Sequence, residues 1–73
     1  MDEENVAVMI YTTMYIKSHG LLFDFEEVQK AFPRYTAQRL YAYIHVLTEK
    51  GLFKKVIIKK DDISLYKITW RVV

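Results

Sequence analysis

The chain has 73 residues, no cysteine and a formal net charge of +2, with 52% hydrophobic and 27% charged residues. This composition is typical of one small folded domain, and it excludes a disordered chain, a disulfide-stapled domain and a thiolate metal site. No segment reaches the roughly 18 apolar residues of a membrane span, and the acidic start MDEEN is unlike a signal peptide, so we expect an intracellular, cytoplasmic protein.

The charges are distributed unevenly along the chain. Residues 1–30 have a net charge of −4 (six acids, two lysines), residues 31–50 of +2 (three cations, one acid) and residues 51–73 of +4 (six cations, two acids). A basic second half predicts that the later elements form an anion-facing surface. Charge scattered over a solvated surface is the alternative, because a basic patch taken singly is a weak signal.

The first predicted element is a helix over about residues 3–19. Asp2 can cap its start, and Gly20 can end it in a left-handed conformation. Its expected buried face follows the i, i+3, i+4 spacing of a helix and consists of Val6, Met9, Ile10, Thr13 and Met14.

A short second helix is predicted over about residues 25–32, after a brief extended segment at Leu21–Phe23. Asp24, followed three residues later by Glu27, forms a capping-box pattern that starts this helix. Pro33 ends it. The extended segment is free to add a third strand at the edge of a later hairpin.

The third helix is predicted over about residues 37–50, between a cap at Thr36 and a stop at Gly51. Its expected buried stripe is Leu40, Ile44 and Leu47, supported by Ala37. An advance of 100° per residue places on the opposite side Gln38, Tyr41, Ala42, His45 and Glu49. The tight turn between the second and third helices describes a helix-turn-helix.

The last predicted element is a hairpin over about residues 52–72. Its strands are expected at residues 52–59 and 63–72, joined by a turn at residues 60–62. The segment FKKVIIKKDDISLYKIT mixes β-branched and aromatic residues with lysine. Edge strands carry lysine for solubility whatever the protein does, so the hairpin alone does not distinguish a charged edge from a phosphate-binding surface.

The segment TAQRLYAYIHVLTEKGLF, followed by a lysine-bearing hairpin that ends in LYKIT, resembles the winged helix-turn-helix family, most closely its small MarR-like regulators. The resemblance covers nearly the whole chain. It implies a single α+β domain over residues 1–73, with three helices, a β-hairpin wing and the order α-β-α-α-β-β. In composition the chain is also similar to small winged-helix proteins of crenarchaeal viruses. MarR-like regulators have additional long helices that build their dimer, and this chain has no room for them.

The resemblance implies a sequence-specific regulator of transcription that binds double-stranded DNA, with the third helix in the major groove and the wing on the phosphate backbone. Gln38 can pair with adenine and Ala42 can contact a thymine methyl group. The expected DNA-binding residues are Arg34, Gln38, Arg39, Tyr41, Ala42, His45, Lys54, Lys55, Lys59 and Lys60. The alternative for Tyr41 is a rim residue that covers the core, and for His45 a solvated surface histidine.

The wing lysines alternate along the strands, so they point to both faces of the hairpin and cannot all contact one duplex. Asp61 and Asp62 argue against a wing tip that enters a groove. We therefore expect the flanking lysines to lie along the DNA backbone.

No enzymatic activity, cofactor or metal is expected. Ser18 and Ser64 lie in no recognisable nucleophile motif, and the chain has only two glycines. His19 and His45 lack the spacing of metal ligands, and His19 is more simply a residue that interacts with the end of the first helix.

We expect a homodimer through the first helix or the C-terminal strand. Tyr11, Tyr15 and Ile16 widen the apolar surface of the first helix beyond one stripe. A second functional hypothesis is a winged-helix protein-interaction module, in which this helix and the exposed strand bind another protein and the lysines only confer solubility.

Overall fold

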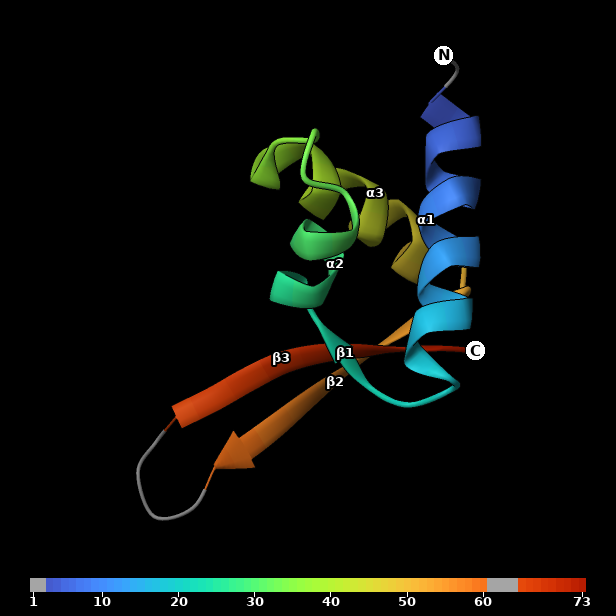
Figure 1. Cartoon of the computed structure of the whole chain (residues 1–73). Coiled ribbons are helices and arrows are strands. Elements are labelled where there is room, and N and C mark those ends of the chain that lie inside the picture. Colours follow the sequence, from blue (N-terminus) through green and yellow to red (C-terminus); the bar gives the residue numbers. More distant parts are fainter. Residues whose placement is uncertain (1–2, 61–64) are drawn as a thin grey trace.

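The computed structural model describes residues 3–60 and 65–73 (Figure 1). Its elements are α1 (Glu3–Ser18), β1 (Phe23–Asp24), α2 (Phe25–Ala31), α3 (Ala37–Glu49), β2 (Phe53–Lys60) and β3 (Leu65–Val72). The predicted α+β order of helix, short strand, two helices and two strands is confirmed, and the arrangement is that of a winged helix. Within the described residues, no helix is both long and apolar enough to cross a membrane.

The three strands form one antiparallel sheet in the order β1-β3-β2. β1 pairs with β3 through Phe23 and Trp70, so the expected third strand does join the hairpin, displaced to residues 23–24. β2 pairs with β3 along its whole length, from Phe53 opposite Val72 onward. Lys60, which was predicted to begin the turn, still belongs to β2, because it pairs with Leu65 of β3. The rest of the predicted turn, at residues 61–62, and the predicted strand start at residues 63–64 lie outside the described residues.

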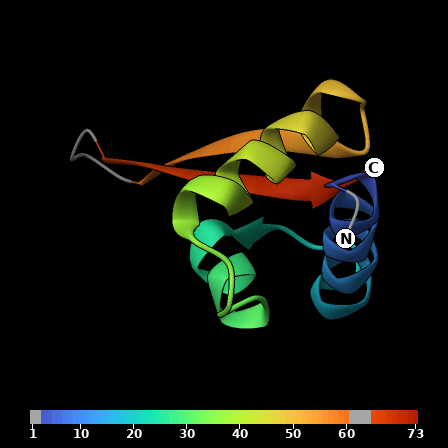
Figure 2. The same cartoon turned by 90° about the horizontal axis from the view of Figure 1, so that it is seen from above.

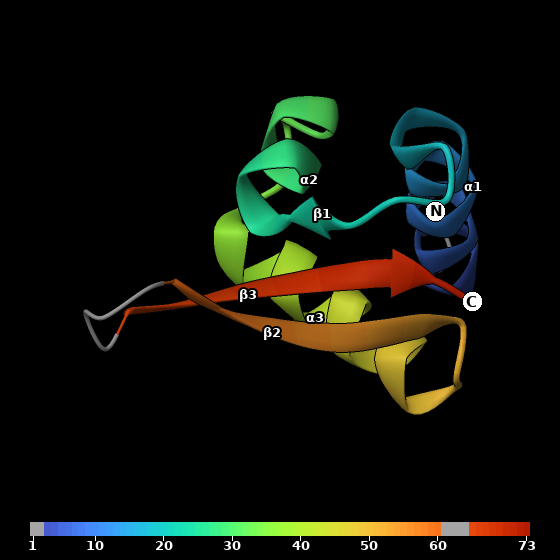
Figure 3. The ribbon, with the colours of Figure 1, turned by 90° about the horizontal axis from the view of Figure 1, so that it is seen from below.

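The helices cover one face of the hairpin only. Seen from above, α3 lies in front of β2 and β3 (Figure 2), and seen from below the two strands lie in front of α3 (Figure 3). The hairpin extends away from the helices at one end of the molecule, while α1 and the C-terminus lie together at the other end. The wing and the outer side of α1 are therefore far apart.

Local sequence signals set the ends of the helices. The Glu27 backbone N–H donates to Asp24 Oδ1 at 2.9 Å, and the Arg39 N–H donates to Thr36 Oγ1 at 3.2 Å, so both predicted caps are confirmed. Helix α2 ends one residue before the prediction, with Phe32 as its non-helical cap, because Pro33 disfavours the helical conformation in the preceding residue.

Helix α1 ends at Ser18, in a left-handed turn of two residues. Gly20 has the expected positive φ, of 78°, and His19 already has a φ of 52°. His19 therefore follows the helix rather than belonging to it, which corrects the predicted end at residue 19. The predicted cap at Asp2 lies outside the described residues.

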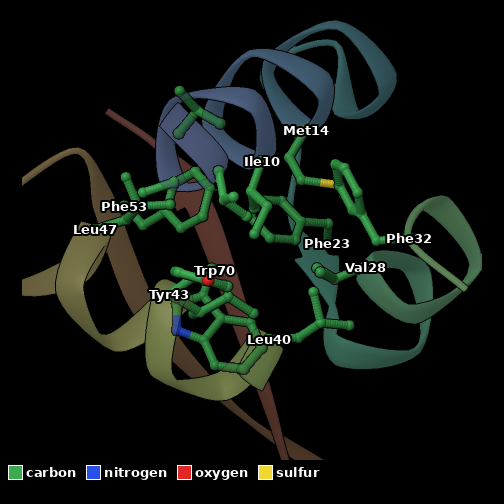
Figure 4. Close-up of a cluster of buried hydrophobic side chains, with 14 residues drawn as sticks. Ile10, Met14, Phe23, Val28, Phe32, Leu40, Tyr43, Leu47, Phe53 and Trp70 are labelled. Carbon is green, nitrogen blue, oxygen red and sulfur yellow. The ribbon is translucent and has the colours of Figure 1, made fainter. Parts of the chain in front are cut away.

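The core lies between the three helices and the helix-facing side of the sheet (Figure 4). Its central aromatic contact is edge-to-face, between Phe23 and Phe53, with ring centroids 5.1 Å apart. Buried side chains come from α1 (Ile10, Met14), α2 (Val28), α3 (Leu40, Tyr43, Ile44, Leu47) and the strands (Phe23, Phe53, Trp70). All three helices and the sheet thus contribute side chains to one continuous apolar core.

Two predicted core assignments were wrong. Met9 is 37% exposed and Ala7 is buried in its place, because the contact with α3 rotates the buried stripe of α1 toward Ala7. Ala37 is exposed because it begins α3 at the end of the helix, and Tyr43 completes the buried stripe instead. Thr13 is only partly buried.

Candidate nucleic-acid interface

Helix α3 has one buried and one outward face, and the outward face is packed against α2 and β3 at Tyr41 while Gln38, Ala42 and His45 stay exposed. Leu40, Ile44 and Leu47 are buried as predicted, with at most 2% of each residue exposed. Gln38, Ala42 and His45 are exposed on the opposite side, also as predicted. An outward helical face of this kind has the width and shape that the major groove of B-DNA accepts.

One charged pair occupies the far end of this outward face. His45 Nε2 lies 3.0 Å from Glu49 Oε1, one helical turn along α3, and both side chains are about 70% exposed. When the imidazole is protonated this contact is an ion pair. The Glu49 carboxylate places a negative charge on the outward face of α3. This face is therefore less basic than the hairpin, which carries the lysines.

A shallow groove of about 110 Å³ separates α3 from the hairpin. Its lining consists of Tyr41, Ile44, His45, Thr48, Lys55 and Trp70. In this groove Lys55 of β2 lies beside Tyr41 and His45 of α3, although it is at least ten residues away from them in the sequence. Thr48, which the sequence analysis did not single out, is held here by donating its hydroxyl to the Ile44 carbonyl at 2.7 Å.

Tyr41 is both a packed and an exposed residue. Its ring stacks on Phe25 with centroids 4.0 Å apart and meets the Trp70 ring edge-on at 6.3 Å. It nevertheless remains 48% exposed. The rim interpretation therefore describes part of the Tyr41 surface, and about half of the residue stays exposed.

The two arginines near α3 differ in their surroundings. The Arg39 guanidinium donates to the Tyr43 hydroxyl at 3.0 Å and lies over the Tyr35 and Tyr43 rings, 5.3 Å and 5.9 Å from their centroids. These contacts hold it toward the α2–α3 corner and away from the centre of the outward face. Arg34 is exposed in the turn between α2 and α3.

The register of the hairpin assigns each wing lysine to one face. Lys55 is opposite Trp70, a residue of the helix-facing side, and Lys59 is opposite Tyr66, so alternation places both lysines on the side of α3. Lys54 is opposite Arg71 on the other side. The prediction that the lysines divide between two faces is confirmed, and only part of the wing faces the same way as α3. The side chain of Lys60 and the residues Asp61 and Asp62 lie outside the described part.

Asp24 neutralises one cation on the side of the sheet away from α3. Lys67 Nζ lies 3.0 Å from Asp24 Oδ2. The hydrogen bond from the Glu27 N–H holds the pKa of Asp24 below its usual value, partial burial opposes this effect, and Lys67 adds to the lowering. The hydrogen bond to Asp24 in turn raises the pKa of Lys67. Lys67 is therefore poorly suited to bind phosphate.

Exposed apolar side chains accompany the lysines on the helix-facing side of the wing. Ile57 pairs with Ile68 across the hairpin, and they are 57% and 40% exposed. Tyr66, opposite Lys59, is 62% exposed. These residues were not predicted from the sequence, since they become a patch only when the register of the two strands is known.

Among the described residues, no three His, Asp or Glu side chains come together to hold a metal ion. Comparison of the chain with protein-family models, with curated proteins and with solved structures finds no significant match. The candidate interface consequently rests on its geometry and charge.

Proposed function

We propose that this protein is a sequence-specific, double-stranded DNA-binding regulator of transcription. In this proposal α3 enters the major groove and the helix-facing lysines of the wing bind the phosphate backbone. The observation that carries it is the groove in which Lys55 of the wing lies beside the outward face of α3. A reading helix with a cation beside it combines the two kinds of contact that specific recognition requires, to base edges and to phosphates.

The residues have separate roles in this proposal. Gln38 and Ala42 read base edges from the outward face, the first by hydrogen bonds and the second by contact with a methyl group. Lys55 and Lys59 bind phosphates and set the register without reading sequence. Arg34, in the turn before α3, is a third exposed cation that suits a phosphate.

The test begins with selection of bound duplexes from a random DNA pool and continues with affinity measured against salt. Replacing Lys55 and Lys59 with alanine should weaken binding to all sequences and reduce the slope of log K against log salt by about 2, since each phosphate contact contributes about 0.9. Replacing Gln38 with alanine should erode the preference for one base, by about 1–3 kcal/mol.

Lys54 supplies the matched control, because it is a lysine of the same strand that points to the opposite face. Its replacement should change the slope less than replacement of Lys55 does. If the helix and wing variants lose the same affinity on every sequence, binding is electrostatic only and the proposal fails. If no variant changes binding, a protein-interaction module replaces it, consistent with the exposed apolar face of α1.

A further inference from the structure

Residues 5–16 of α1 include no charged residue, and most of the exposed side chains on the outer face of this stretch are apolar. Val8, Tyr15 and Ile16 are 60%, 59% and 63% exposed, and Met9 is 37% exposed. Thr12, between them, and Asn5, near the start of the helix, are exposed polar residues of the same face. The inner face of the same helix is packed into the core, so α1 is apolar on both sides, which is typical of a helix that is covered on both sides.

This outer face is symmetric about Thr12. Val8 and Ile16 lie four residues before and after it, and Met9 and Tyr15 lie three residues before and after it. When two copies of α1 cross antiparallel at Thr12, Val8 therefore meets Ile16 of the second copy, and Met9 meets Tyr15 of the second copy. A two-fold contact requires a self-complementary surface of this kind, and a small residue at its centre lets the helices approach closely.

Two hollows adjoin the outer face, near opposite ends of α1. One, of about 400 Å³, lies between α1, the end of α3 and the loop before β2, and its exposed apolar lining is Val8, Val46 and Leu52. The other, of about 540 Å³, is lined by Tyr15, Ile16, His19, Gly20 and Val72. Antiparallel crossing brings Ile16 of one copy to the hollow beside Val8 of the other copy. It also brings Val8 of the first copy to the hollow beside Ile16 of the other, so an apolar side chain can occupy each hollow.

The area available predicts a dimer of moderate strength. A helix of 16 residues is about 24 Å long, so the α1 pair alone buries less than the roughly 800 Å² per partner of a standard interface. Further apolar surface comes from Leu52 and from Val73 at the C-terminus, which lies beside α1 in all three views. The alternative contact through β3 is less suitable, because β3 is the central strand of the sheet.

We propose that a second copy of this chain covers the outer face of α1, forming a two-fold homodimer in which the helices cross antiparallel at Thr12. The dimer uses the end of the molecule opposite the wing. On α3 its exposed apolar contact is Val46, so Gln38, Ala42 and the wing lysines stay free. The proposal does not depend on DNA binding.

Sedimentation equilibrium over a range of concentrations tests the association. The wild-type chain should dimerise with a dissociation constant in the micromolar range, and Ile16→Glu should raise that constant at least about tenfold by placing a charge in the contact. Ile57→Glu is the matched control, because Ile57 is similarly exposed but lies on the wing. It should leave the dimer unchanged. A chain that stays monomeric at about 0.5 mM overturns the proposal.

Cysteine cross-linking tests the geometry without disturbing the apolar contact. Because the chain has no cysteine, Thr12→Cys introduces one thiol at the proposed two-fold axis, and mild oxidation should link two copies through it. Val8→Cys and Ile16→Cys should link to each other in a mixture, more readily than either links to itself. Gln29→Cys on α2 is the control. The proposal is wrong if Thr12→Cys cross-links no faster than Gln29→Cys, or if Ile16→Glu folds and still dimerises as the wild type does.

Discussion

Asp24 connects two parts of the fold through its two carboxylate oxygens. One oxygen accepts the Glu27 N–H that caps α2, and the other contacts the Lys67 ammonium of β3. The cap determines where α2 starts, and the ion pair joins that start to the wing. The helix cap made by Asp24 can be predicted from the sequence. Its ion pair with Lys67 cannot, because that contact depends on how the strands pair.

We expect Asp24→Asn to keep the cap and to lose the ion pair, because asparagine also accepts the Glu27 N–H. The folded-state pKa of Asp24 lies below the ordinary value of 3.8, so its ionised form stabilises the fold above about pH 4. This contribution disappears as the pH falls through the folded-state pKa. Urea unfolding should show the wild type to be more stable than the variant at neutral pH.

The stability difference between these two proteins should shrink toward about pH 2. Asp24→Ala, which removes the cap as well, should be destabilised by about 1 kcal/mol more than Asp24→Asn. An equal difference between wild type and Asp24→Asn at neutral and acid pH would contradict the assigned ion pair.

Leu40 and Ile44 supply the buried stripe of α3, and each is almost entirely inaccessible to solvent. Replacing either with alanine should lower the free energy of unfolding by about 2–5 kcal/mol, through lost apolar contacts and the cavity left behind. Val46→Ala, on the same helix but 39% exposed, should change it by only about 0.5 kcal/mol. Thermal or urea unfolding measures all three variants, and equal effects would show that the faces of α3 are wrongly assigned.

At the scale of elements, α3 and the hairpin contribute different chemistry to the candidate interface. The outward face of α3 offers Gln38 and Ala42 but also Glu49, while the near side of the hairpin offers Lys55 and Lys59. The side chains of α3 are thus suited to distinguish between bases, and the lysines of β2 are suited to attract phosphate groups. If α3 binds DNA as proposed, the effect of the Glu49 charge on affinity reports how close the C-terminal end of α3 lies to the duplex.

We expect Glu49→Gln to bind DNA more tightly than the wild type, by up to about fivefold at low salt, because a carboxylate near a phosphate is repelled by about 1 kcal/mol in water. The gain should decrease as salt screens the interaction. Glu26→Gln is the matched control, since Glu26 is also an exposed helical carboxylate in an i, i+4 pair, with Lys30. Equal affinity changes in the two variants would place α3 away from the DNA.

At the scale of the whole molecule, the wing and the outer face of α1 occupy opposite ends. DNA binding at one end and self-association at the other can therefore occur together. If both proposals hold, a two-fold dimer presents two α3 helices to one duplex, and each helix reads one half-site.

Selected DNA sequences should then contain an inverted repeat whose half-site centres are about 10 base pairs apart, or a multiple of that spacing. Ile16→Glu should still bind a single half-site but should lose the preference for the paired arrangement. Gel-shift titration on paired and single half-sites measures the difference. Selected sites without two-fold symmetry would separate DNA binding from dimerisation.

Local sequence signals were enough to predict the type of each element, the starts of α2 and α3, and the helix ends to within one residue. Asp24, Thr36, Pro33 and Gly51 act within a few residues of their own position, so caps and stops could be located without knowledge of the fold. The outward set of α3 could likewise be predicted, because helical periodicity is a local property. Three helices followed by two strands then led to the winged-helix arrangement.

Contacts between distant segments set which side chains share a surface, and these could not be predicted from the sequence. The pairing of β2 with β3 placed Lys55 and Lys59 with α3 and Lys54 on the other side, because register depends on contacts between strands. Packing between α1 and α3 turned Met9 outward and buried Ala7 in its place. These outcomes depend on residues far apart in the chain, so short-range periodicity contains no information about them.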